Sequence, residues 1–214
     1  MTSVLLTGFE PFGGETTNPS WAAVQAVRDE WWGPEEIHVR ELPVAFDAVG
    51  RALADAIRDT DPTIVICVGQ AGGSSSIAVE RVAINVDDAR IPDNTGFQPI
   101  DEPILVDGPA AYFSTLPIKA AVAAVKARGI DVAVSQTAGT YTCNHVFYLL
   151  MNELAPRHLQ VRGGFVHVPY SPDQTVGTDR PSMPIEAMTE ALAAIVAAVL
   201  TTEADLKLVG GSLD

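Results

Sequence analysis

Short apolar runs alternate along the chain with longer segments in which apolar residues recur every three or four positions. The short runs are typical of strands and the longer segments of helices. Strands are expected at 4–7, 37–44, 64–68, 77–86, 104–106, 132–135 and 165–168. The run at 64–68 is apolar at every position, which is typical of a strand that is covered on both faces.

Helices are expected at 18–32, 46–59, 117–128, 143–154 and from residue 184 onward. Asn18 and Pro19 are a start signal for the first helix, as its cap and its first helical residue. Gly129 is expected to stop the helix at 117–128, and Ser182 to cap the last one.

Because strands and helices alternate, we predict a single domain over residues 1–214. Its fold is expected to be a three-layer α/β/α sandwich around a mixed, largely parallel central sheet. We find no repeat, low-complexity segment or linker that would divide the chain. Residues 206–214 contain a glycine pair and are expected to form a loose tail or an oligomer contact.

Composition agrees with a globular chain, since 47% of its 214 residues are hydrophobic and the length suffices for a substantial core. A formal net charge of −14 disfavours nucleic acids and anionic membranes as partners. We see no apolar run of membrane-spanning length and no basic start of a signal peptide. A reducing cytoplasm is therefore the expected location of the two cysteines.

Cys143 is the candidate nucleophile. It follows a strand-like run and a turn, and it opens the helix expected at 143–154. Unpaired backbone N–H groups and the positive end of the helix dipole favour a thiolate there, and the thiolate is the reactive form. The alternative is a small buried apolar residue, which is how we interpret Cys67 inside its apolar run.

A catalytic thiolate works with a histidine, whose ring is in turn oriented by a third group. His167, at the end of an expected strand, is the preferred base, because His145 lies two positions from Cys143 on one helix and does not face it. Glu80 is the preferred third group, since a charge in an otherwise apolar strand requires a partner. Alone, His167 would be a structural histidine and Glu80 an exposed partner of Arg81.

Three loops are unusual for their composition. The loop at 8–14 sets Phe9 and Phe12 among glycine and proline, which predicts either the walls of a pocket or an aromatic plug. The glycine-rich loop at 69–76 allows a ligand to approach the backbone, but it lacks the lysine and the following helix of a phosphate loop. The acidic loop at 87–101 matches no calcium-binding spacing, so no metal site is predicted.

Together these segments resemble the pyroglutamyl peptidase I family, also called pyrrolidone-carboxylate peptidases. The matching runs are TGFEPFGG (7–14), NPS (18–20), GQAGG (69–73), ERVAIN (80–85), DARIPDNTG (88–96), AGTYTCNH (138–145) and GFVHVP (164–169). The resemblance implies a cysteine peptidase that removes N-terminal pyroglutamate from peptides, with a triad at Glu80, Cys143 and His167. It also implies an α/β/α sandwich, no cofactor, a cytoplasmic location and a homo-oligomer, frequently a tetramer.

The pyroglutamyl ring is a flat, neutral lactam, which suits a pocket with aromatic walls and a few fixed hydrogen-bond partners. The expected binding residues are Phe9, Phe12 and Tyr141 as walls, Gln70 and Asn18 at the polar ends, and Arg90 beside the oxyanion. Ser74 is a departure, because related sequences often carry arginine after GQAGG. This departure puts the anchoring of the loop near Glu80, and with it the detailed pocket geometry, in question.

Two other classes of function are alternatives. One is a non-catalytic protein that binds a small molecule in the same pocket, which would have no reason to make Cys143 react rapidly with alkylating reagents. The other is a nucleoside or phosphate enzyme on a similar α/β sandwich, with the glycine-rich loop around the phosphate. The acidic charge balance disfavours the second alternative.

Overall fold

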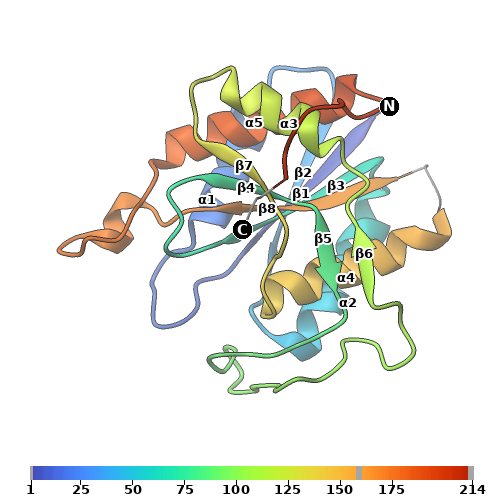
Figure 1. The fold of residues 1–214 in the computed structure, drawn as a ribbon, viewed down its shortest axis with the longest axis vertical. Coiled ribbons are helices and arrows are strands. Elements are labelled where there is room, and N and C mark those ends of the chain that lie inside the picture. Colours follow the sequence, from blue (N-terminus) through green and yellow to red (C-terminus); the bar gives the residue numbers. More distant parts are fainter. Residues whose placement is uncertain (1, 158–160, 212–214) are drawn as a thin grey trace.

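A six-stranded sheet runs through the middle of the molecule and carries helices on both faces (Figure 1). The computed structural model describes residues 2–157 and 161–211. The strands lie in the order β2 (Glu36–Leu42), β1 (Ser3–Phe9), β3 (Ile64–Gln70), β8 (Arg162–Val168), β4 (Ile77–Glu80) and β7 (Val132–Ser135). Neighbouring strands are parallel, except that β4 and β8 are antiparallel. The prediction of a mixed, largely parallel sheet is confirmed.

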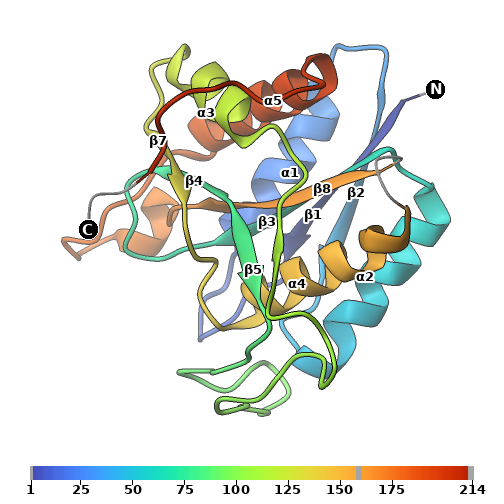
Figure 2. The same ribbon diagram turned by 45° about the vertical axis from the view of Figure 1, so that its right-hand side comes forward.

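The helices divide between the two faces of this sheet (Figure 2). One face carries α1 (Pro19–Glu30), α3 (Ile118–Lys126) and α5 (Ile185–Thr201), and the other carries α2 (Phe46–Thr60) and α4 (Thr142–Leu154). Short 3-10 turns lie at Ala155–Arg157 and Pro172–Thr175. Each face has its own apolar core, and the predicted three-layer α/β/α sandwich is confirmed. Asn18 caps α1 as predicted, since its side chain accepts a hydrogen bond from the Ser20 N–H (3.1 Å).

The single strand predicted at 77–86 is wrong, because the chain changes partners at Arg81. β4 ends at Glu80, and β5 (Val82–Ile84) pairs instead with β6 (Ala111–Phe113) in a separate two-stranded sheet. The Arg81 N–H still donates to the Ser135 carbonyl (3.0 Å), while the Arg81 carbonyl accepts from the Ser114 N–H (2.9 Å). The alternation changes phase here, from Ile77 and Val79 to Val82 and Ile84, with the charged Glu80 and Arg81 between them, and the prediction of a single strand leaves this signal out.

The strand predicted at 104–106 is also wrong, and β6 was not predicted. A side chain takes the place of a partner strand here: the Asn85 amide donates to the Leu105 carbonyl (2.8 Å) and accepts from the Leu105 N–H (2.9 Å). Ser182 does not cap α5. It forms an isolated bridge with Tyr170, and the cap position falls to Pro184, which has no side-chain hydrogen bond to offer.

The predicted tail lies partly outside the described residues, since 212–214 are not among them. Residues 206–211 form neither helix nor strand, and Val209 is fully exposed. They are nevertheless held to the body of the molecule, because Lys119 Nζ donates to the Leu208 carbonyl (2.6 Å) and Arg81 Nη2 to the Gly210 carbonyl (3.2 Å). Among the described residues, no helix combines the length and apolar character that crossing a membrane requires.

Candidate active site

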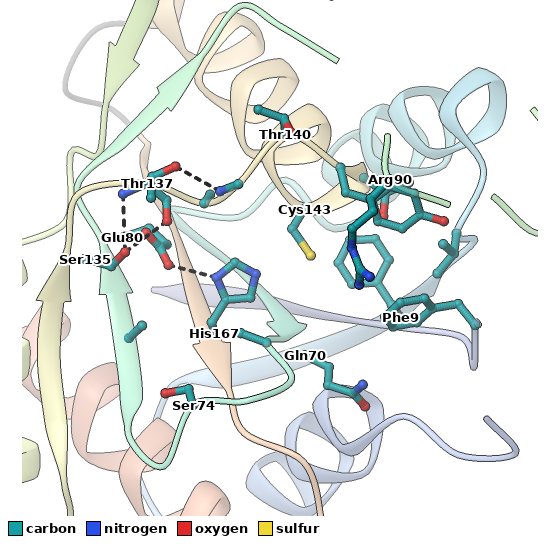
Figure 3. A pocket seen from close by; sticks show the side chains of 18 of the residues that line it. Phe9, Gln70, Ser74, Glu80, Arg90, Ser135, Thr137, Thr140, Cys143 and His167 are labelled. Carbon is teal, nitrogen blue, oxygen red and sulfur yellow. Dashed lines mark hydrogen bonds and ion pairs between the residues drawn. The ribbon is translucent and has the colours of Figure 1, made fainter. Parts of the chain in front are cut away.

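A cavity of about 640 Å³ opens where β3 and β8 end, beside β4 and the start of α4 (Figure 3). Ligand sites of open α/β sheets typically lie at the carboxyl ends of the strands, where loops meet. The residues predicted for the site all line this cavity. They are Phe9, Phe12, Asn18, Gln70, Glu80, Arg90, Tyr141, Cys143 and His167, and Ser74, the departure from the family pattern, lines it as well.

Sheet register brings Glu80 and His167 together. Ala78 on β4 is the register partner of His167 on β8, and Glu80 lies two residues further along β4, on the same face. His167 Nδ1 lies 2.8 Å from Glu80 Oε1. Glu80 is 1% exposed and its Oε2 has no hydrogen-bond partner in the described part of the chain, so His167 is its one stabilising contact there. The exposed pairing of Glu80 with Arg81 is therefore not what the structure has.

Cys143 is the second residue of α4, and its side chain is partly buried. Its N–H is among those at a helix start that lack an intrahelical partner. The sulfur lies over Gly69 of β3, where an added Cβ would come within 2.7 Å of it and within 2.8 Å of Phe165. Gly69 is also the register partner of His167, so the absence of a side chain there leaves room for sulfur and imidazole to meet.

The imidazole of His167 lies between the carboxylate of Glu80 and the sulfur of Cys143 (Figure 3). Burial disfavours the charged ring and lowers the pKa of His167. The Cys143 thiolate, through its charge and a hydrogen bond, and then Glu80 outweigh burial and raise this pKa to about 10. With this raised pKa the His167 ring is protonated at neutral pH, and its position between the sulfur of Cys143 and the carboxyl group of Glu80 suits proton donation after nucleophilic attack by the sulfur.

Cys67 has a different environment from Cys143, although both are free thiols. It lies inside β3 with 0% exposure, and burial, with a minor contribution from the Cys143 charge, raises its pKa to about 12. The interpretation of Cys67 as an inert core residue agrees with this position.

Three aromatic rings form one wall of the cavity. Phe9 is 2% exposed at the end of β1, and Phe12 follows in the loop and packs against Tyr141 with ring centroids 6.0 Å apart. The Tyr141 hydroxyl donates to the Pro92 carbonyl (3.1 Å), and burial raises its pKa to about 12, with the charges of Asp93 and Cys143 adding to the shift. Because Phe9 and Phe12 both line the cavity, they are wall residues and not only a plug of the sheet end.

Polar groups occupy the remaining wall. The Asn18 amide anchors the loop, since it donates to the Glu10 carbonyl (3.0 Å) and accepts from the Ser20 N–H and hydroxyl. Gln70 Oε1 accepts from Gln174 Nε2 (2.9 Å), which leaves the Gln70 NH₂ group available. Among the described residues, the Arg90 guanidinium has no ion pair or hydrogen bond, and it extends beside the sulfur and Phe9 (Figure 3). In the part of the chain that is described, no cluster of three or more ligating side chains could hold a metal ion.

Ser74 closes its own loop. Its Oγ donates to the Ser76 carbonyl (2.9 Å) and accepts from the Ser76 N–H (3.1 Å). The glycine-rich loop therefore holds its shape here through a local serine turn.

The sequence reasoning did not identify two buried carboxylates beside the site. Asp93 accepts hydrogen bonds from the Phe46, Thr95 and Phe97 N–H groups and the Thr95 hydroxyl; burial raises its pKa, but these bonds dominate and lower it. Asp87 Oδ2 lies 2.7 Å from Nδ1 of His145, the histidine that was set aside as a base. The loop at 87–101 is predicted to supply Arg90 and to hold no metal, but the need of a buried aspartate for partners also points to these two residues.

Known proteins match this chain along its length. A sequence profile described as pyroglutamyl peptidase matches residues 2–202. The pyrrolidone-carboxylate peptidase of Clavibacter michiganensis subsp. michiganensis is 64% identical over 214 residues, which is 100% of both chains. That of Yersinia pestis (strain Pestoides F) is 51% identical with the same coverage.

Solved structures give the same result. The crystal structure of pyroglutamyl peptidase I from Bacillus amyloliquefaciens superposes with a TM-score of 0.93 at 48% identity, covering 96% of this chain and 100% of that one. Pyrrolidone carboxyl peptidase from Thermococcus litoralis superposes with a TM-score of 0.92 at 38% identity, covering 97% and 99%. The predicted fold class and the predicted family resemblance are both confirmed.

Proposed function

The chain belongs to the pyroglutamyl peptidase family, and we propose that it is a cysteine peptidase that removes an N-terminal pyroglutamyl residue from peptides, with Cys143 as its nucleophile. The observation that carries the assignment of residues is the position of the His167 imidazole. It contacts a buried carboxylate, Glu80, through one nitrogen and faces a thiol at a helix start with its other side. This is the arrangement that activated cysteine nucleophiles require.

The reaction proceeds in two steps. The Cys143 thiolate attacks the carbonyl carbon that joins pyroglutamate to the next residue, and a C–S bond forms while the carbonyl oxygen becomes an oxyanion. The N–H of Cys143 and the Arg90 guanidinium stabilise this oxyanion. His167 gives its proton to the leaving amine, the C–N bond breaks and a thioester remains. Water then attacks the thioester as His167 takes a proton back, and pyroglutamate is released. Glu80 keeps the ring oriented and stabilises its charged form.

Ring recognition follows from the cavity walls. Phe9, Phe12 and Tyr141 are flat apolar surfaces for the lactam, and the free NH₂ group of Gln70 is a donor for its carbonyl. A proline ring has the same shape without that carbonyl, so it leaves the donor unpaired, which costs orders of magnitude in rate. A free N-terminal glutamine carries a charged amine, which this apolar wall would have to desolvate.

The triad is tested with a fluorogenic pyroglutamyl amide. We expect Cys143→Ser and His167→Ala each to lower kcat/KM by about 1,000-fold or more, because each removes a group that takes part in bond making or proton transfer. Cys67→Ala is the matched control, since it removes the other thiol, which lies in the core, and should retain activity. Activity near the wild-type level in either triad variant would refute the assignment of Cys143 or His167.

Recognition of the lactam is tested by comparing pyroglutamyl and prolyl amides that share one leaving group. We expect the prolyl amide to react at least about 1,000-fold more slowly. Equal rates would refute lactam recognition while leaving the cysteine chemistry in place. The same comparison separates a peptidase from a non-catalytic binder, which would turn over neither amide.

The remaining expectations concern location and assembly. We propose a cytoplasmic enzyme, in agreement with two free cysteines, and a homo-oligomer, either a tetramer or a dimer. Exposed apolar side chains, among them Val106 and Ile100, are surface that an assembly would bury. Light scattering coupled to gel filtration gives the mass of the assembly, and a monomer at micromolar concentration would refute this proposal.

A further inference from the structure

A second buried histidine–carboxylate pair lies behind the nucleophile. His145 Nδ1 is 2.7 Å from Asp87 Oδ2, and the two residues are 8% and 6% exposed. The edge of the His145 ring packs against Phe46, with centroids 5.4 Å apart and planes at 80°. Asp87 Oδ1 has no hydrogen-bond partner in the described part of the chain, so His145 is the main compensation for burying this carboxylate.

Asn144, between Cys143 and His145 on α4, holds the segment just before Asp87 against the start of this helix. It is fully buried, its amide NH₂ donates to the carbonyls of Ile84 (2.9 Å) and Val86 (3.0 Å), and its Oδ1 accepts from the Ile84 N–H (3.0 Å). Two consecutive residues after the nucleophile thus bind residues 84–87 from one side. The first turn of α4 and this segment therefore behave as one unit.

The fastened segment continues directly into the wall of the cavity. The Asp88 N–H donates to the Thr140 carbonyl (2.9 Å), and the Thr140 hydroxyl donates to the Asp88 carbonyl (2.8 Å). Arg90 and Ile91 follow and line the cavity. Residues 87–91 are thus attached at one end to the helix that carries the nucleophile. Toward the other end they carry Arg90, whose guanidinium extends beside the sulfur (Figure 3).

We propose that His145 and Asp87 form a positioning pair, which holds the cavity wall at residues 87–91 in place relative to the thiolate of Cys143. The inference rests on the proposed function. Its two members touch neither the sulfur nor the substrate cavity, whose lining includes neither of them. They act through the placement of Arg90, and a displacement of about 1 Å at a reacting group can cost about 100-fold in rate.

Steady-state kinetics on a pyroglutamyl amide test the pair. His145→Ala should lower kcat/KM by roughly 10- to 100-fold, mainly through kcat, because Arg90 contributes where charge develops. His145→Asn should recover to within about fivefold of wild type, since its amide can place a donor near the position of Nδ1. His38→Ala is the control: His38 is a partly buried histidine whose Nε2 lies 3.5 Å from a carboxylate, Glu36, but on β2, away from the cavity.

A second variant covers the case in which His145→Ala does not fold. Asp87→Ala breaks the pair from the other side. It leaves an imidazole without its partner, whereas His145→Ala leaves a carboxylate, and an imidazole can be buried at lower cost because it can be uncharged. The same loss in kcat is expected. Folded Asp87→Ala or His145→Ala with wild-type kcat/KM overturns the inference, as does His145→Asn that is no better than His145→Ala.

Alkylation of Cys143 by iodoacetamide separates positioning from activation of the thiol. The reagent is small and does not need Arg90, so His145→Ala should alkylate within about twofold of the wild-type rate, whereas His167→Ala should react much more slowly. Equal slowing in both variants would mean that His145 acts on the thiolate itself and would overturn the inference. Absence of hydrolysis by the wild-type enzyme would instead overturn the proposed function, and this inference with it.

Discussion

The molecule pairs a buried histidine with a buried carboxylate at two places that are close to one helix start. Nδ1 of His167 lies 2.8 Å from Glu80, and Nδ1 of His145 lies 2.7 Å from Asp87. The bond itself does not distinguish the two pairs. The difference is on the far side of each ring, where His167 faces the sulfur of Cys143 and His145 faces Phe46. A histidine–carboxylate pair takes part in catalysis only when the other side of the imidazole ring faces a reacting group.

The two pairs also differ in the secondary-structure elements that carry them. Glu80 and His167 project from neighbouring strands of the central sheet, so backbone register sets their separation. Asp87 follows a short strand of the small sheet and His145 lies on a helix, so this pair joins two elements that could otherwise shift. We infer that the first pair needs a rigid base for proton transfer, while the second supplies rigidity to the wall of the cavity.

The largest expected difference between the pairs is in the response to neutralising each carboxylate. Glu80→Gln should lower kcat/KM by about 1,000-fold, because an amide cannot stabilise the imidazolium or hold the ring in the required tautomer. Asp87→Asn should lower it by less than about tenfold, since the amide keeps a hydrogen bond to His145 and the wall stays in place. Steady-state assays on purified, folded variants decide this. Equal losses would abolish the distinction between the pairs.

The second expected difference is in the pH profile. The pKa of His167 is raised from 6.5 to about 10, so its protonated form persists at neutral pH and is lost as the pH rises through about 10. Protonated His167 therefore adds stability to the folded state that is complete below about pH 6.5. This stability is lost as the pH rises from about 6.5 to about 10. Because the leaving amine needs this proton, kcat/KM should fall on the alkaline side near pH 10.

Variants of the two pairs sharpen the test. Glu80→Gln removes one of the interactions that raise the pKa of His167, so its residual activity should fall off at a lower pH than in the wild type. Asp87→Asn should keep the wild-type profile. A wild-type alkaline limb near pH 7, or one that moves in Asp87→Asn, would contradict the assignment of this limb to His167.

The third expected difference concerns the two thiols. Cys143 faces His167, whereas Cys67 lies in the core inside β3. Iodoacetamide at pH 7.5 should give a single adduct on the native protein, at Cys143. Cys67 has a pKa raised to about 12, chiefly by burial, and should react at least about 100-fold more slowly until the protein is unfolded. Intact-mass and peptide mass spectrometry measure both sites. Comparable labelling of Cys67 in the folded protein would show that the position of the thiol at the helix start is not what makes it reactive.

Local patterns were sufficient to predict most of the sheet, the helices and the triad residues, whereas Asn18, Arg90 and Tyr141 were expected at the cavity only through the family resemblance. Asn18–Pro19 marks the start of α1 because cap and first-turn chemistry is local, and the position of Cys143 at a helix start follows from the apolar run after it. Glu80 could be singled out because a lone charge in an apolar strand is unusual at any position. In each of these cases the signal lies within a few residues of the feature.

Features that depend on distant partners could not be predicted in this way. The partner of β5 after the break at Arg81 is β6, about thirty residues later, and the shift of apolar phase between Val79 and Val82 marks the break but not this partner. The Asp87–His145 pair joins residues 58 positions apart in the chain. Neither residue type nor spacing specified that pair, and the helical spacing from Cys143 only showed where His145 does not point.

The smallest expected effect tests the apolar side of the second pair. Phe46 is 5% exposed and meets His145 and Tyr141 edge to face, each with ring centroids 5.4 Å apart. Phe46→Leu keeps most of the apolar volume and the backbone N–H that Asp93 binds, but it loses the ring contacts. We expect the free energy of unfolding in urea to fall by about 1 kcal/mol, with kcat/KM within about threefold of wild type.

Phe113→Leu, on the exposed β6, is the matched control and should change neither quantity. If Phe46→Leu instead lost as much activity as His145→Ala at unchanged stability, the ring of Phe46 and not the carboxylate of Asp87 would be the group that holds His145 in place. The second pair would then be an aromatic contact with an incidental ion pair, because a carboxylate bond at 2.7 Å would have been left intact without preserving function.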